Sequence, residues 1–191
     1  MESISQAQAA PRRSVYSGPL ATATLGAAFI GVFVAFAAWT GQWYATWKAL
    51  HVLMAIVWIG GALMIQLFAF RILNTDDDER MAKFAEDVQF ISMRTFIPAS
   101  LVLVILGFVL EHQAHWGFHF WIVFALVIWG LSFVTGAAFL GPESGKIGKL
   151  IAEHGADAEV RLRIERVLLV SRIELVLLAL VAMDMVLKPG A

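Results

Sequence analysis

The stretch ALHVLMAIVWIGGALMIQLFAF, residues 49–70, decides the fold class of this chain. It is apolar apart from His51 and Gln66, and it ends at Arg71. About 20 apolar residues in a helix cross the roughly 30 Å hydrocarbon core of a bilayer, because each residue adds about 1.5 Å. The stretch therefore predicts a transmembrane helix.

Four further stretches approach the same length. They cover residues 20–39, 92–110, 118–140 and 167–187. The third of these is expected to stop at Gly141–Pro142, since glycine and proline commonly follow the end of a helix. The sequence thus predicts an all-α, polytopic membrane helical bundle with five transmembrane helices. A cytoplasmic tail, residues 1–19, would precede a single domain over residues 20–190.

Composition excludes several classes of protein. Of the 191 residues, 60% are hydrophobic and 15% charged, against about 45–50% and about 25% in soluble domains. A net charge of -1 provides no basic field for nucleic acid. With no cysteine, disulfides, thiolate metal sites and catalytic thiols are excluded. The expected partner is the lipid bilayer, together with other membrane proteins or a second copy of the chain.

Two connections are long enough to form helices of their own. The connection at residues 76–94 opens with acidic residues that suit a helix N-terminus. The connection at residues 143–166 is expected to break at Gly155. Both are amphipathic, which predicts connectors that lie in the membrane interface.

Orientation follows from where Lys and Arg gather in the connections. One of the two expected sides carries almost all of them: Arg12, Arg13, Arg71, Arg80, Lys83, Arg94, Lys146, Lys149, Arg161, Arg163 and Arg166. The other side has Lys48 in the first connection. The sequence predicts a bacterial-type inner membrane protein with a cytoplasmic N-terminus and a C-terminus outside.

Ionisable groups within the spans are costly and usually face the bundle interior. They are His51, Arg172, Glu174 and Asp184. Arg172 and Glu174 lie two residues apart, so on a helix they point in different directions. Each is expected to need a partner from another helix, such as Gln66. The alternative is that these polar groups only join helices or reach the nearby interface.

His51 is the first candidate ligand. It shares a helix face with Ala55 and Trp58, and Met54 is adjacent. An imidazole in an apolar groove beside small and aromatic residues suits axial ligation of a haem. The alternative is a neutral histidine whose ring N–H bonds a backbone carbonyl or Asp184.

A second cluster lies near the outer end, at His112, His115 and His119. On one continuous helix these three would share a face, and imidazole suits copper, zinc and iron. The sequence therefore predicts metal or haem ligation by at least one of them. The alternative is that a wet interface simply favours such residues. The thioethers of Met54, Met183 and Met185 suit Cu(I), or else pack the bundle.

The run Trp47–His51, followed by Trp58 and Gly60–Gly61, resembles the opening helix of the CopD-like superfamily of integral membrane proteins. That superfamily includes copper-resistance D proteins and HemJ-type protoporphyrinogen oxidases. The remaining landmarks are similar to an uncharacterised branch: Pro98, Gly136, Phe139–Pro142, Ser171–Glu174 and Asp184–Gly190. The resemblance covers about Trp43 to Gly190.

The resemblance implies a four-helix core, with the first span as an addition, and haem b on the histidine at position 51. Two departures argue against protoporphyrinogen oxidase activity. Gln66–Phe68 stands where the HemJ pattern has an arginine, and the later lysine of that pattern has no counterpart in a span.

The expected function is binding of haem b through His51, with a redox or haem-handling role; any enzyme activity would be that of an oxidoreductase. The second axial ligand would be His112, His115, His119 or another group. One alternative is copper binding or transport by the outer His and Met residues. Another is a non-catalytic accessory subunit of a membrane complex.

Overall fold

The computed structural model describes residues 19–75 and 77–189. Within these residues helices are the only regular secondary structure, so the all-α prediction is confirmed. The predicted tail with Arg12 and Arg13 lies outside the described residues, apart from Pro19. Internal contacts divide the chain into two compact units, Met1–Thr46 and Trp47–Ala191.

The first unit contains α1 (Pro19–Thr40), which carries no charged residue. Gly41 follows it with a φ of 71°, a backbone conformation that glycine adopts without the steric cost of a Cβ atom. The predicted first span, residues 20–39, falls within this helix.

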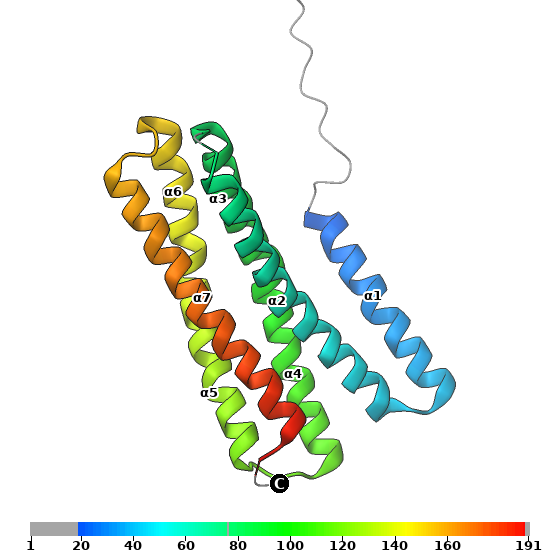
Figure 1. Ribbon diagram of the computed structural model, residues 1–191. Coiled ribbons are helices and arrows are strands. Elements are labelled where there is room, and N and C mark those ends of the chain that lie inside the picture. Colours follow the sequence, from blue (N-terminus) through cyan, green and yellow to red (C-terminus); the bar gives the residue numbers. More distant parts are fainter. Residues whose placement is uncertain (1–18, 76, 190–191) are drawn as a thin grey trace, which may run out of the picture. The chain divides into compact units, whose positions relative to one another are not determined.

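The second unit is a bundle of four helical rods that run in alternating directions (Figure 1). The rods are α2 (Trp43–Leu73, of which residues 43–46 belong to the first unit), α3–η1–α4 (Asp78–Ile91, Ser92–Phe96, Ile97–Ala114), α5–η2–α6 (Phe120–Thr135, Gly136–Leu140, Gly141–His154) and α7 (Ala158–Leu187). Glycines with positive φ lie in the α4–α5 loop, at Gly117, and in the α6–α7 loop, at Gly155. We call the two ends of the bundle the Gly117 end and the Gly155 end.

Three of the rods, Trp43–Leu73, Asp78–Ala114 and Phe120–His154, are long and apolar enough to cross a membrane. The chain is therefore treated as a membrane protein. The last two contain 37 and 35 residues, and each is about 50 Å long at roughly 1.5 Å per residue. Both exceed the roughly 30 Å hydrocarbon core, so part of each extends beyond it.

The predicted helix stop at Gly141–Pro142 is wrong, because the rod continues through it. A π-helical segment, η2, directly precedes these residues, and the N–H of Gly141 donates to the carbonyl of Gly136, five residues earlier. The same arrangement precedes Pro98, where the N–H of Ile97 donates to the carbonyl of Ser92. Proline normally breaks a helix because its ring crowds the preceding turn. A wider π turn relieves that crowding.

The two amphipathic connections also differ from the prediction. Instead of lying across the rod ends as interfacial connectors, α3 and α6 extend the rods and pack against each other. Their apolar faces form a buried cluster with the start of α7: Met81, Ala82, Ala85, Ile147, Ile151 and Val160. The expected acidic start of α3 is confirmed, since Asp77 caps it by accepting the N–H of Arg80 at 3.0 Å. The predicted break at Gly155 is confirmed as well.

Charged side chains join α6 to α7 beside this cluster. The guanidinium of Arg163 lies 2.8 Å from Glu143 and 3.1 Å from Glu159, and Lys146 lies 3.6 Å from Glu143. Hydrogen bonds with Glu143 and then Glu159 raise the pKa of Arg163. This network of charges suits the part of the bundle that extends beyond the hydrocarbon.

Candidate functional site: a tryptophan-lined cavity and a smaller polar cavity

A cavity of about 720 Å³ lies toward the Gly117 end, between α2, α4, α5 and α7. Its wall is mostly apolar and includes four indole rings, those of Trp58, Trp116, Trp121 and Trp129. The ionisable side chains in the wall are His51, Lys48, Glu111 and Lys188. Ligand sites usually measure about 300–1,000 Å³ and combine an apolar wall with a few polar groups. We call this space the tryptophan cavity.

His51 enters the wall from α2 with its ring fixed by one hydrogen bond. Its Nδ1 atom lies 2.9 Å from the carbonyl oxygen of Leu103 on α4. A carbonyl only accepts, so Nδ1 carries the proton and donates. The lone pair of the neutral ring then lies on Nε2, which no hydrogen bond from the described residues reaches. This arrangement, a ring N–H held by a backbone carbonyl, is the one that orients a metal-ligating histidine.

Space beside the imidazole comes from the helix opposite it. A Cβ atom added at Gly107 of α4 would lie 3.5 Å from Cε1 of His51, so the ring lies over a residue with no side chain. The backbone of α2 also lies farther from its neighbouring helices than the other helices of the unit lie from theirs. The cavity occupies the space that remains between α2 and the rest of the bundle.

The rim at the Gly117 end carries both signs of charge. The ammonium of Lys188 lies 4.1 Å from the ring centroid of Trp116 and 5.2 Å from that of Trp121, a favourable cation–π arrangement. Glu111 accepts the N–H of Gly117 at 3.2 Å. An occupant of the cavity would meet cationic groups there, from Lys188 and Lys48.

The three outer histidines do not come together on one helix face. Helix α4 ends at Ala114, His115 follows in the left-handed conformation with a φ of 52°, and His119 caps the start of α5. The rings of His112 and His115 lie 6.0 Å apart, but all three side chains are exposed and none lines the tryptophan cavity. In the part of the chain that the structure describes, no group of three His, Asp or Glu side chains is placed to hold a metal ion.

The methionines separate in the same way. Met54 does not line the tryptophan cavity, and Met183 is exposed, whereas Met185 of α7 is in the cavity wall. The wall therefore contains the thioether of Met185 as well as the imidazole of His51. The indoles of Trp121 and Trp129 were not singled out from the sequence. With Ala125 between them, at a spacing of four, they form one face of α5, and that spacing could have identified them.

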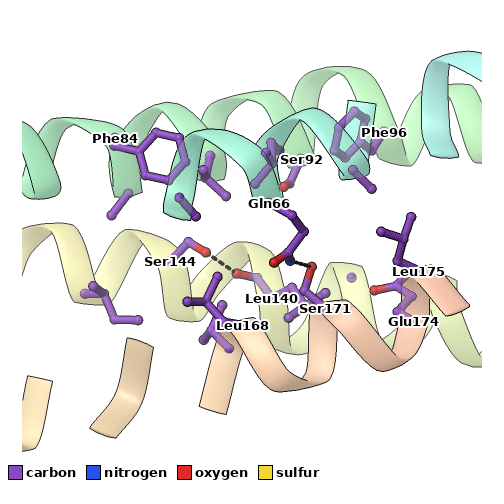
Figure 2. A pocket seen from close by; sticks show the side chains of 18 of the residues that line it. Gln66, Phe84, Ser92, Phe96, Leu140, Ser144, Leu168, Ser171, Glu174 and Leu175 are labelled. Atoms are coloured by element: carbon purple, nitrogen blue, oxygen red, sulfur yellow. Dashed lines mark hydrogen bonds between the residues drawn. The ribbon is translucent and has the colours of Figure 1, made fainter. Parts of the chain in front are cut away.

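A second, smaller cavity of about 130 Å³ lies on the side of the Gly155 end. Its wall is mostly apolar, and we call it the polar cavity because it includes Gln66, Ser171 and Glu174 (Figure 2). Gln66 donates to the hydroxyl of Ser171 at 2.7 Å, and the Nε of Arg172 lies 3.4 Å from the amide oxygen of Gln66. Gln66 is thus a partner of Arg172, but Arg172 is exposed rather than in the bundle interior as expected.

The two cavities adjoin along the bundle, since Trp58 and Leu178 are in the walls of both. Asp184 is in neither wall. Its side chain is buried, and its Oδ2 atom has no hydrogen-bond partner among the described residues. The hydrogen bond from the His51 ring to the carbonyl of Leu103 is the contact that the alternative interpretation, a neutral histidine without a ligand, predicted; Asp184 is not its partner.

Comparison with protein-family models, with curated proteins and with solved structures gives no match. The resemblance to the CopD-like superfamily therefore stays a prediction.

Proposed function

We propose that this chain is a multi-pass protein of the bacterial inner membrane that binds haem b in the tryptophan cavity, with His51 as an axial ligand. A redox or haem-handling role would follow, since a bound haem supplies one-electron chemistry at its iron. We also propose that α1 and α7 cross the membrane with the three longer rods, which gives five spans. The N-terminus would then face the cytoplasm.

The observation that carries the proposal is the state of the His51 ring. Its Nδ1 proton is used by the carbonyl of Leu103 at 2.9 Å, which leaves Nε2 as the free nitrogen of a residue in the cavity wall. Neutral imidazole with one free nitrogen is the form that binds iron. A histidine with both nitrogens bonded to protein would not support the proposal.

The wall of the tryptophan cavity also suits the porphyrin ring and the carboxylates of haem b. Its size and its four indoles suit a large planar apolar ligand, and aromatic rings stack favourably on such a surface. Haem b also carries two carboxylates, which Lys48 and Lys188 at the rim would pair with. Oppositely charged partners at one end would fix which way the group enters.

The second axial ligand is the point at which the structure changes the prediction. The expected candidates His112, His115 and His119 lie outside the cavity wall, whereas Met185 lies in it. We therefore propose Met185 in their place. Ligation by methionine and histidine raises the reduction potential relative to two histidines.

Haem content of purified variants tests the proposal. His51→Ala should contain little haem, and added imidazole should restore part of it, because free imidazole can occupy the vacated ligand position. His112→Ala and His115→Ala are matched controls, since they remove exposed imidazoles and should keep the wild-type content. Stoichiometric copper that is lost with His112 and His115, in a protein without haem, would support the copper alternative instead.

A further inference from the structure

The polar cavity contains one ionisable side chain without an ionic partner. Glu174 projects into it from α7, one helical turn beyond Ser171 (Figure 2). Among the described residues no ion pair or hydrogen bond reaches this carboxyl group. With α7 crossing the membrane, as proposed above, such a group is expensive and is by default a functional candidate.

No countercharge comes from the neighbouring elements. The walls contributed by α2, α3, η1, α4, α5, η2 and α6 contain no other ionisable side chain among the described residues. On α7 itself, Arg172 is exposed and directs its Nε toward Gln66. An unpaired carboxylate away from water is costly. Binding a proton removes its charge, and no cationic side chain of the described residues lines this cavity.

The cavity has the size and the polar groups to hold water. A water molecule needs about 10–15 Å³ of such space, so about 130 Å³ accommodates several. Ser132 in the wall is 3% exposed, and its hydroxyl has no hydrogen-bond partner among the described residues. Buried polar groups of this kind are normally satisfied by an internal water.

The backbone around the cavity is irregular on two sides. Both π-helical segments contribute to the wall, η1 through Ser92 and Phe96, and η2 through Gly136 and Leu140, and they contact each other. Single π turns within α-helices occur frequently at functional sites. Here they line the same cavity as Gln66, Ser171 and Glu174.

The two ends of the cavity differ in their surroundings. Toward the Gly155 end its wall includes Met81, Ala85 and Ile151 of the buried cluster. Toward the Gly117 end it reaches Trp58 and Leu178, which it shares with the tryptophan cavity. We infer that the polar cavity is a water-filled proton site in which Glu174 binds and releases a proton. This inference rests on the proposed crossing of the membrane by α7, and it does not require that haem is bound in the tryptophan cavity.

Carbodiimide labelling of the full-length protein in membranes tests the proton. Dicyclohexylcarbodiimide reacts with a protonated carboxyl group: the acid proton moves to a carbodiimide nitrogen while the carboxyl oxygen bonds to the central carbon. The acyl group then migrates to nitrogen and leaves a stable N-acylurea, which peptide mass spectrometry locates. We expect labelling at Glu174, and a decline of about tenfold per pH unit once the group ionises. The variant Glu174→Gln should lose the label at that peptide.

Three results would overturn the inference. The first is that Glu174 remains unlabelled at acidic pH. The second is that it is labelled equally at every pH, which would indicate a proton that never exchanges. Protection by sodium at constant pH would assign the site to a metal cation instead.

A second measurement tests access by water. The chain has no native cysteine, so Ser171→Cys places a single thiol of similar size in the cavity wall. We expect this thiol to react with a small hydrophilic methanethiosulfonate added to the purified protein in detergent. The control is Ala179→Cys on the exposed surface of α7, which should react slowly because hydrocarbon covers it. An unreactive Ser171→Cys in folded protein that reacts after denaturation would contradict a water-filled cavity.

Discussion

The ring of His51 and the backbone carbonyl of Leu103 are joined by a 2.9 Å hydrogen bond that connects α2 to α4 across 52 positions of sequence. The bond fixes both the tautomer and the direction of the imidazole. It also leaves Nε2 without a hydrogen bond from the described residues, and His51 shares a cavity wall with four indole rings. The proposed cofactor site depends on this one contact more than on any other.

Gly107 lies opposite this ring, and enlarging it should displace His51. In Gly107→Ala the new Cβ atom would lie 3.5 Å from Cε1 of His51, an ordinary contact, so haem content should stay near the wild-type value. Gly107→Leu adds three further carbon atoms beside the ring and should lower the haem content severalfold. Absorbance per mole of purified protein measures both.

The control for this pair is Gly130→Leu on α5, where a Cβ atom meets nothing within 4 Å. It should keep its haem. If Gly107→Leu also binds haem normally, the ring does not need the position that the structure gives it.

The contact between α3 and α6 makes a prediction about stability that is independent of any cofactor. A Cβ atom at Gly148 would lie 3.0 Å from the backbone carbonyl of Ala82, and backbone cannot move without separating the two helices. Overpacking of this kind costs about 1–3 kcal/mol. Gly148→Ala should therefore lower the free energy of unfolding in detergent by up to about 2 kcal/mol, after the roughly 1 kcal/mol gain from replacing a helical glycine.

Gly145→Ala is the informative comparison, because its Cβ atom would meet the end of the Gln89 side chain, which can swing away. This variant should unfold at the wild-type denaturant concentration or above it, because the same gain from replacing a helical glycine applies. Equal destabilisation by both substitutions would show that the backbone contact at Ala82 is not the limiting one.

Orientation can be measured with single cysteines, because none competes in the natural sequence. Gln113→Cys places an exposed thiol at the Gly117 end, and Glu153→Cys places one at the Gly155 end. A membrane-impermeant maleimide should label the first in intact spheroplasts and the second only after permeabilisation. The opposite pattern would reverse the proposed topology, since it would place the basic connections outside.

Much of the fold could be predicted from the sequence, because a bilayer imposes simple requirements on length and polarity. The rods correspond to the apolar stretches, and the start of α3 at Asp77 and the break at Gly155 follow from local capping chemistry. The continuation through Pro142 could not be predicted in the same way. A π turn at residues 136–140 precedes the proline, and α3 and α6 pack together beyond it.

The candidate site was less accessible to sequence reasoning. His51 could be chosen because an ionisable residue in an apolar stretch is rare, and Gln66 could be paired with Arg172 because they lie at similar depth. The grouping of Met185 and Lys188 with His51 in one cavity wall depends on how α7 packs against α2. No local pattern contains that information. The prediction of a metal site at the outer histidines assumed one continuous helix. Their spacing would align them only if α4 continued past Ala114, where it ends.

The most direct test of the central claim is the reduced-minus-oxidised optical spectrum of the full-length protein, purified from cells supplied with haem. The account predicts the Soret and α bands of a b-type haem, at about one haem per chain, and their loss in His51→Ala. A purified, folded protein without haem absorbance, or one in which His51→Ala retains the full spectrum, would contradict it.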